Sequence, residues 1–358
     1  MNDRVPAQRR YEVASDTAGK SRDLLMELWE RCWAGANKPT PPLGPKFEWF
    51  YLQNPAGEAN SHRLIDLESS EIVGMLMGVP RVFLVDGREQ RGVGFMDFLV
   101  AAEHRSFAPA VKLQGVAHEA ELQTATLAYA IPNPRAARLC ERANVGFRFN
   151  RPRFAVVIRH APYLARTLPD PIARLGGAIL DVASSGLRLL RARALPRLQG
   201  EWVNDFDQRF DALWSRVPTT GRLIGVRDSE FLRWRFLRQP GRTYRTLTVR
   251  APGAAELIGY FVSEMQGNVL SVRDFLTVGG VHEQLAAWRT LWESARECGA
   301  QGITCDVQAD RATTDVLRRS GYKVRGSTMV FVDLTERCRD VKQNDPESWY
   351  LTPADEDI

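Results

Sequence analysis

Apolar and polar residues in the first third of the chain follow first a helical and then a strand-like spacing. Leucines and tryptophans recur every three or four positions from Ser21 to Trp33, which predicts an amphipathic helix. Strand-like apolar runs follow over 62–66, 72–85 and 92–101. Asp86-Gly87, between the last two runs, is typical of a type I′ hairpin turn, in which both central residues take positive φ. The pattern therefore predicts an antiparallel meander.

After the meander, helical and strand-like patterns alternate. Apolar spacing predicts a helix over 108–120, a strand over 124–131, a second helix over 135–143 and a strand over 147–157. A meander continued in this order gives a mixed sheet that is covered by helices. The expected fold class is therefore α/β, with an α+β mixed sheet.

The second half of the chain repeats this order. Strand-like runs between 244 and 278 precede a helix over 281–297, a strand over 302–307, a helix over 311–320 and a strand over 322–332. Because the same series of patterns occurs twice, we interpret the chain as one fold that is present in two copies.

Two short motifs support this interpretation, since each occurs once in each half. The pattern W-x-x-L-x-x-P starts at Trp49 and again at Trp234, and the triplet Asp-Phe-Leu starts at Asp97 and again at Asp274. Both tryptophans stand among spaced leucines, so we interpret them as core residues, each anchoring a helix over its own sheet.

Composition is that of a soluble globular protein of two domains. The chain has 358 residues, of which 44% are hydrophobic and 25% charged. No run reaches the roughly 20 apolar residues of a membrane-spanning helix, and no signal peptide is recognisable, so we expect a cytoplasmic protein. Five cysteines and five histidines are scattered, which predicts neither disulfides nor a metal site.

The net charge of +5 is concentrated between the two halves. Residues 151–200 hold nine arginines against Asp170 and Asp181. A basic amphipathic segment of this kind can lie on an anionic membrane surface. Glycines and Asp181 within 169–197 favour instead a connecting helix packed on the domains. At the other end, we expect 349–353 to dock on the body and leave the acids of the tail outside.

Chemistry is most clearly indicated where the strand that contains Asp97 leads into a helix near Ala108. A helix that starts at small residues presents unpaired backbone N–H groups and the positive end of its dipole. Such a start binds anions and suits a pyrophosphate. Arg105 adds a charge-assisted contact.

This passage resembles the acyl-coenzyme A signature of the GNAT superfamily of N-acetyltransferases. In that family a strand ends at R/Q-x-x-G-x-G/A and the next helix holds the pyrophosphate; Arg105, Ala108 and Ala110 occupy the three positions. The run 129–147 resembles the second motif of the family, with Asn133 opening a helix. The resemblance spans about 11–157, and the repeat extends the implied fold to the second half.

The resemblance implies two tandem GNAT-like acyl-CoA N-acyltransferase domains. The expected division is a cofactor-binding domain over 1–158, a basic connector over 159–200, a domain that has lost its cofactor motif over 201–335, and an acidic tail over 336–358. Acetyl-CoA, or another acyl-CoA, is the implied cofactor. The residues expected to bind it are Leu99, Val100, Arg105, Ser106, Phe107, Ala108, Ala110 and Asn133.

The family reaction is direct attack of an acceptor amine on the thioester, which calls for a proton acceptor. Asp97 and Glu103 are the candidates, with His104 as an alternative. Cys140 stands where many relatives place the tyrosine that protonates the leaving thiolate. Pro109 departs from the family pattern, because it removes one possible N–H donor.

Three functions stay open on these residues. The first is an N-acyltransferase, preferably an N-acetyltransferase, acting on a small-molecule, sugar or peptide amine. The second is a FemABX-like aminoacyl transferase that uses charged tRNA, with the basic segment as the tRNA contact. The third is an inactive GNAT-like binding scaffold. DNA binding is not expected, because the charge is confined to a connector, and membrane contact through 169–197 is a minor alternative.

Overall fold

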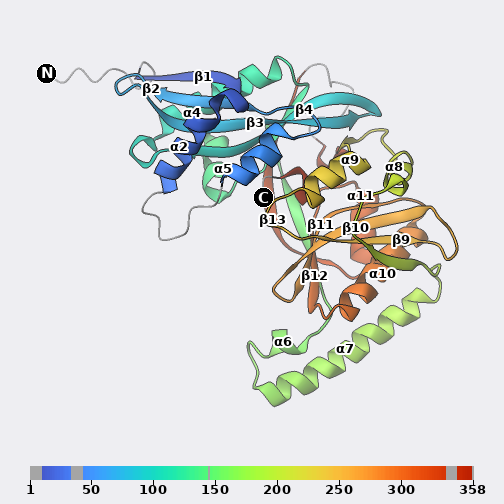
Figure 1. Ribbon diagram of the computed structural model, residues 1–358. Helices are drawn as coiled ribbons and strands as arrows, with labels where there is room; N and C mark the ends of the chain where they lie inside the picture. The colour runs from blue at the N-terminus through green and yellow to red at the C-terminus, as the bar shows by residue number, and fades with distance from the viewer. Residues whose placement is uncertain (1–9, 34–42, 144–145, 336–344, 357–358) are drawn as a thin grey trace.

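The computed structural model describes residues 10–33, 43–143, 146–335 and 345–356, and it shows two halves joined by a shared sheet (Figure 1). The first half begins with a strand and a helix and continues with the meander. Its elements are β1 (Tyr11–Thr17), α2 (Arg22–Trp33), α3 (Leu43–Lys46), η2 (Phe47–Leu52), β2 (Asn60–Asp66), β3 (Glu71–Val85), β4 (Arg88–Val100), α4 (Phe107–Leu122), β5 (Leu127–Ala130), α5 (Pro134–Ala143) and β6 (Phe147–Val157).

The second half follows a helical connection and repeats the series. The connection is α6 (Ala161–Leu164) and α7 (Asp170–Ala192). The elements that follow are β7 (Gln199–Val203), α8 (Gln208–Trp214), β8 (Leu223–Gly225), α9 (Ser229–Leu232), η4 (Arg233–Leu237), β9 (Arg245–Arg250), β10 (Leu257–Gln266), β11 (Val269–Thr277), α10 (Val281–Glu297), β12 (Gly302–Asp306), α11 (Arg311–Arg319), β13 (Lys323–Leu334) and β14 (Trp349–Tyr350). The predicted fold class and the repeated order are confirmed.

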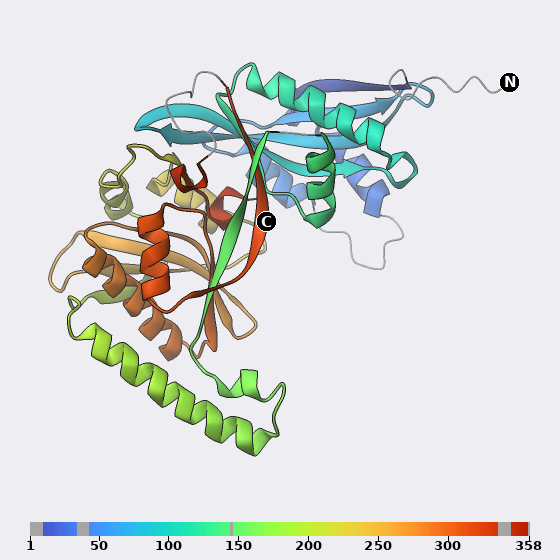
Figure 2. The same cartoon turned by 180° about the vertical axis from the view of Figure 1, so that it is seen from behind.

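The strands of both halves form one sheet, in which the last strand of each half is exchanged. The sheet runs β1-β2-β3-β4-β5-β13-β6-β12-β11-β10-β9-β7, so β13 lies between β5 and β6. Figure 2 shows β6 and β13 crossing together from one half to the other. The predicted domain boundaries stay a prediction, since the halves share these closing strands.

Side chains from both faces of β3 show how helices cover the first half. Val73 and Leu76 pack in the cluster that contains Leu113 of α4. Met75 and Met77 pack in the larger cluster with Leu25 of α2. The hairpin between β3 and β4 has the predicted turn, because Asp86 and Gly87 have φ of 50° and 79°.

The two repeated tryptophans meet each other at the junction of the halves. The indole Nε1 of Trp49 donates to the carbonyl of Trp234 over 2.6 Å, and that of Trp234 donates to the carbonyl of Trp49 over 2.9 Å. Their ring centroids are 5.5 Å apart, and both side chains are buried. The prediction of core positions is confirmed, but the pair joins the two copies instead of anchoring each copy separately.

The tail docks as expected, but its acids do not stay outside. β14 pairs with β8, which in turn pairs with β3, so the tail is tied to both halves. Asp355 is only 2% exposed and forms ion pairs with Arg227 and Arg81. Glu356 pairs with Arg151. Burial of the Asp355 carboxylate is possible because two buried guanidinium groups face it. Asp357 lies outside the described residues.

Candidate active site

A cavity opens where β4 and β5 stop pairing. These parallel strands pair at three positions, the last being Gly94 with Tyr129, after which they diverge. The cavity of about 400 Å³ between them is lined by residues of α2, β4, α4, α5 and the β5–α5 connection. Phe331 of β13 adds a wall from the second half of the chain. Strand exchange therefore contributes directly to this site.

Four of the residues predicted for the site lie in this cavity. They are Asp97, Leu99, Asn133 and Cys140. The side-chain oxygen of Asn133 accepts from the backbone N–H groups of Arg135 and Ala136 over 3.0 and 3.1 Å, which caps α5 as the sequence predicts.

Asp97 occupies a bulge in β4. Met77 pairs with Met96 and Met75 with Leu99, so two β4 residues oppose one residue of β3. Asp97 itself has a φ of 47°, a left-handed conformation that non-glycine residues seldom adopt. The bulge turns the strand at the point where the cavity begins, and strained backbone of this kind is typical of functional sites.

The carboxylate of Asp97 is already engaged by two donors. Lys46 Nζ donates to Asp97 Oδ2 over 2.7 Å, and the hydroxyl of Tyr51 donates to the same oxygen. Asp97 is therefore held in place at the wall of the cavity. Lys46 lies in α3, and Tyr51 lies in η2 within the repeated tryptophan motif.

The start of α4 presents donors without a side-chain cap. Ser106 is the N-cap residue and its side chain makes no capping hydrogen bond, and no acid stands in the first turn. Because Pro109 has no N–H, the donors of the first turn are those of Phe107 and Ala108. Both of these residues and Ser106 are exposed, whereas Ala110 is buried. The helix dipole makes this end suitable for an anion.

Arg105 stands beside this helix start. Its Nε donates to the carbonyl of Val100 over 2.7 Å, which fixes the base of the guanidinium while the residue stays exposed. Val100 is buried and contributes through its backbone.

Glu103 and His104 lie outside the cavity. Glu103 is exposed in the short turn between β4 and α4. His104 Nδ1 lies 3.0 Å from the hydroxyl of Tyr11, on β1. Neither is brought to Cys140 or Asp97.

Cys140 is buried, and its sulfur accepts a weak hydrogen bond from a side-chain amide. Gln114 Nε2 lies 3.4 Å from its sulfur. Burial raises the pKa of the Cys140 thiol, because a thiolate is poorly solvated there. The side chain is therefore a neutral thiol at pH 7.

The structure adds His118, which the sequence interpretation missed. It lines the cavity from α4, four residues after Gln114, and its Nε2 lies 3.1 Å from Asp333 Oδ2 of β13. Its ring also stacks on Phe95, with centroids 5.9 Å apart. The helical spacing from Gln114 could have placed His118 on the same face, but its aspartate partner comes from the other half.

In the second copy, the tail lies at the position that corresponds to the cavity of the first copy. β11 and β12 pair last at Val272 with Cys305, and the tail lies beyond that point. There the hydroxyl of Tyr350 donates to the carbonyl of Phe275, and Leu351 forms a bridge with Gln308. The tail thus occupies the gap that corresponds to the cavity of the first copy.

The helix start of the second copy also differs. Glu283 lies in the first turn of α10. A Cβ placed on Gly280 would be 3.0 Å from Glu283 Oε2, so the Glu283 carboxylate lies at the N-terminal end of α10. Asp274, the counterpart of Asp97, is fully buried and accepts from Arg227 and Thr352. A carboxylate at the helix start disfavours a bound phosphate.

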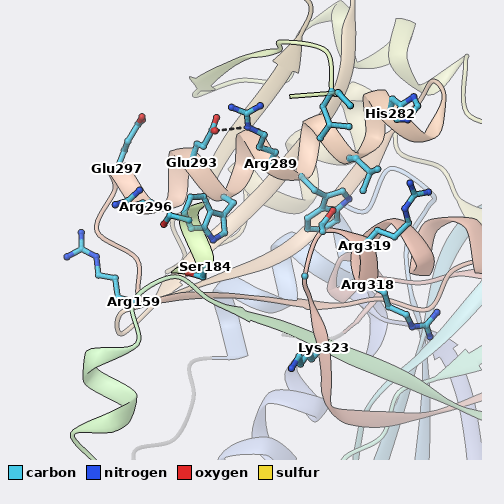
Figure 3. A pocket seen from close by; sticks show the side chains of 18 residues that line it. Arg159, Ser184, His282, Arg289, Glu293, Arg296, Glu297, Arg318, Arg319 and Lys323 are labelled. Carbon is cyan, nitrogen blue, oxygen red and sulfur yellow. Dashed lines mark hydrogen bonds and ion pairs between the residues drawn. The ribbon is translucent and has the colours of Figure 1, made fainter. Parts of the chain in front are cut away.

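A second and larger groove lies in the second half (Figure 3). It has a volume of about 1300 Å³ and lies between α7, α10 and the passage from α11 into β13. Its charged side chains are mostly basic: Arg159, His282, Arg289, Glu293, Arg296, Glu297, Arg318, Arg319 and Lys323. Arg289 is paired with Glu293 over 2.7 Å. None of the predicted site residues lines this groove, so we place the candidate site in the β4–β5 cavity.

Several solved structures share this architecture. A GCN5-related N-acetyltransferase from Anabaena variabilis superposes with a TM-score of 0.60 at 15% identity, over 92% of this chain and 74% of that one. The chain has the GCN5-related N-acetyltransferase fold. Another such acetyltransferase, from Kribbella flavida, gives 0.53 at 12% identity, over 92% and 72%. A conserved Enterococcus faecalis protein of unknown function gives 0.58 at 11%, over 90% and 72%.

Sequence comparisons add no closer relationship. No protein-family model matches the chain, and no curated protein matches it. The GNAT fold is therefore established by the structure, while activity has to be argued from the residues of the site. No helix among the described residues is long and apolar enough to cross a membrane.

Proposed function

We propose that this protein is an acyl-CoA-dependent N-acyltransferase with a single active site in the β4–β5 cavity. One observation carries the proposal: an open strand edge, a cavity and an uncapped helix start follow one another along the passage from β4 to α4. The expected acceptor is a small-molecule, sugar or peptide amine.

The described residues fit an acyl-CoA thioester. An extended ligand with amide groups can pair with a strand edge, and β4 beyond Gly94 offers such an edge to the cavity. The pyrophosphate suits the N–H groups of Phe107 and Ala108 at the start of α4. Arg105 supplies the positive charge for a charge-assisted hydrogen bond to a phosphate oxygen.

Cavity size favours a short acyl group. Ligand pockets range from about 300 to 1,000 Å³, and the cavity of about 400 Å³ is near the lower end. Because the pantetheine arm must share this space, we propose acetyl-CoA as the donor.

The reaction needs a proton acceptor and a proton donor at the cavity. Attack of the amine on the thioester carbonyl forms a C–N bond and breaks the C–S bond; the amine loses a proton and the departing thiolate gains one. His118, whose Nε2 lies 3.1 Å from Asp333 Oδ2, and Asp97 are the groups in the cavity that can accept the amine proton. Cys140 is a neutral thiol that can supply the other.

Titration calorimetry with acetyl-CoA tests the binding step. We expect wild-type protein to bind, and Arg105→Glu to weaken binding by about 10- to 100-fold, since a charge-assisted hydrogen bond contributes about 1.5–3 kcal/mol. Arg88→Glu is the matched control, because Arg88 is an exposed arginine at the opposite end of β4. Absence of heat with wild type, or equal affinity in both variants, would refute the proposal.

Turnover is tested separately by release of free coenzyme A thiol. A panel of sugar, peptide and small-molecule amines is offered with acetyl-CoA, and products are identified by mass spectrometry. We expect thiol release to depend on at least one amine. If the protein bound acetyl-CoA tightly but released no coenzyme A thiol with any amine, it would be a binding scaffold, and the enzymatic part of the proposal would be excluded.

A further inference from the structure

Helix α7 is held against α6 by one of its faces. A Cβ on Gly177 would lie 2.5 Å from the Ala161 backbone, so a glycine is what allows the two helices to approach. Asp181 Oδ1 accepts from the backbone N–H of His160 over 2.9 Å and lies 2.6 Å from the Nδ1 of its ring. Ala173 is buried on the same face. These contacts fix which side of α7 points outward.

The opposite face of α7 is an exposed apolar stripe. Its residues recur every three or four positions, the spacing of one helix face. The exposed fractions are 58% for Ile172, 67% for Leu175, 61% for Ile179 and 74% for Val182. Figure 1 shows α7 at the edge of the molecule, beyond the second half. A contiguous row of this kind marks an interaction surface, whereas single exposed leucines are ordinary.

The charge around the stripe is strongly positive. Four arginines between residues 160 and 200 are described and exposed: Arg166, Arg174, Arg193 and Arg197. Of the two acids in this range, Asp181 is taken by His160, which leaves Asp170. A second copy of this protein is a poor partner, because two such positive surfaces repel each other. A nucleic acid is also a poor partner, because it offers no apolar layer for the stripe. A surface with anionic groups above an apolar interior satisfies both features.

We propose that α7 binds the surface of a membrane that contains anionic lipids. The apolar stripe enters the boundary between headgroups and acyl chains, and the flanking arginines contact the headgroups. This mode of attachment is peripheral and requires no membrane-spanning helix. It is independent of the proposed enzymatic function, because none of these residues lines the β4–β5 cavity.

Vesicle co-sedimentation of the full-length protein tests this. We expect binding to vesicles of equal parts phosphatidylglycerol and phosphatidylcholine, and much weaker binding to phosphatidylcholine alone. The double variant Ile172→Glu/Ile179→Glu should raise the lipid concentration for half binding by at least about tenfold. Arg166→Glu/Arg174→Glu should act in the same direction, and about 1 M NaCl, where the Debye length is about 3 Å, should reduce wild-type binding.

A matched control separates this effect from a general loss of apolar surface. Leu67→Glu/Val324→Glu replaces two residues that are each 50% exposed elsewhere, and it should bind vesicles as wild type does. Circular dichroism checks that all variants are folded. Failure of wild-type protein to sediment with anionic vesicles would overturn the proposal. The proposal would also be overturned if light scattering showed that the wild-type protein is a dimer, that the Ile172→Glu/Ile179→Glu variant is a monomer, and neither protein bound vesicles.

Discussion

Replacement of Asp355 should destabilise the fold strongly, although this residue lies in the acidic tail. Two carboxylates and two guanidinium groups meet without solvent: Asp274 and Asp355 face Arg227 and Arg81. Their charges balance. Asp355→Asn keeps the size of the side chain and leaves one uncompensated positive charge, so we expect the free energy of unfolding to fall by about 3–5 kcal/mol.

The upper part of this range is favoured by the contacts that an asparagine cannot replace. Arg227 keeps Asp274, but among the described residues Arg81 keeps the carbonyl of Val226 as its one hydrogen-bond acceptor. Burial lowers the pKa of Arg81, and the nearby charge of Asp355 opposes that effect. Burial alone would raise the pKa of Asp355, but Arg227 and Arg81 outweigh it and lower this pKa.

This pKa direction predicts the pH dependence. A carboxylate whose pKa is lower in the folded state adds stability above its unfolded pKa of about 3.9, and this stability is lost as pH falls through the lower folded value. Wild-type stability should therefore decline on acidification through this range. Asp355→Asn should remove part of that decline, because the residue that titrates is gone.

Urea unfolding followed by circular dichroism at pH 7 and in acid measures both effects. Asp315→Asn is the control, because Asp315 is 48% exposed in a surface pair with Arg318 and should change stability by less than about 1 kcal/mol. A loss of less than about 1 kcal/mol for Asp355→Asn would refute the reasoning, since it would mean that Arg81 and Arg227 need no compensating charge.

Three further predictions concern the site. Ala108→Glu places a carboxylate in the first turn of α4, as Glu283 does in α10. Calorimetry should then show acetyl-CoA binding that is at least about tenfold weaker. The melting temperature should be unchanged or higher, because an acid in the first turn stabilises a helix by about 0.3–1 kcal/mol. His118→Gln should lower kcat by about 100-fold with little change in KM for acetyl-CoA, and an unchanged kcat would exclude it as the proton acceptor. Burial raises the pKa of Cys140, so at pH 7 it should react with iodoacetamide more slowly than the half-buried Cys298. Mass spectrometry of peptides measures the order of alkylation, and alkylation of Cys140 first would contradict the prediction.

Local patterns predicted the elements of this fold well, because helix and strand periodicity depends on neighbouring residues. The spacing over 281–297 and over 147–157 coincides with α10 and β6. The partner of β6 could not be predicted in this way. The strand at 323–334 is the last strand of the second copy in the sequence, and the repeat alone does not say that it will pair with β5 and β6 of the first copy.

The parts of the site that sequence reasoning missed depend on contacts between the halves. Asn133 and Cys140 were found through motifs within a single copy. Phe331 reaches the cavity, and Asp333 reaches His118, only because β13 lies beside β5. The burial of Asp355 has the same origin, since its partner Arg81 is in the other half of the chain. The acidic residues at the end of the sequence, considered without their partners in the first half, indicate a solvated tail.

The two copies use one backbone feature in opposite ways, and this is the structural reason for proposing a single site. In each copy the central parallel pair of strands separates beside an aspartate, Asp97 or Asp274. In the first copy the gap is a cavity that leads to an uncapped helix start. In the second, Thr352 of the tail donates to Asp274 over 2.6 Å, and Glu283 stands at the helix start. Because the space and the helix start are occupied by different segments, we expect that removal of either segment alone would not give the second copy an acyl-CoA site.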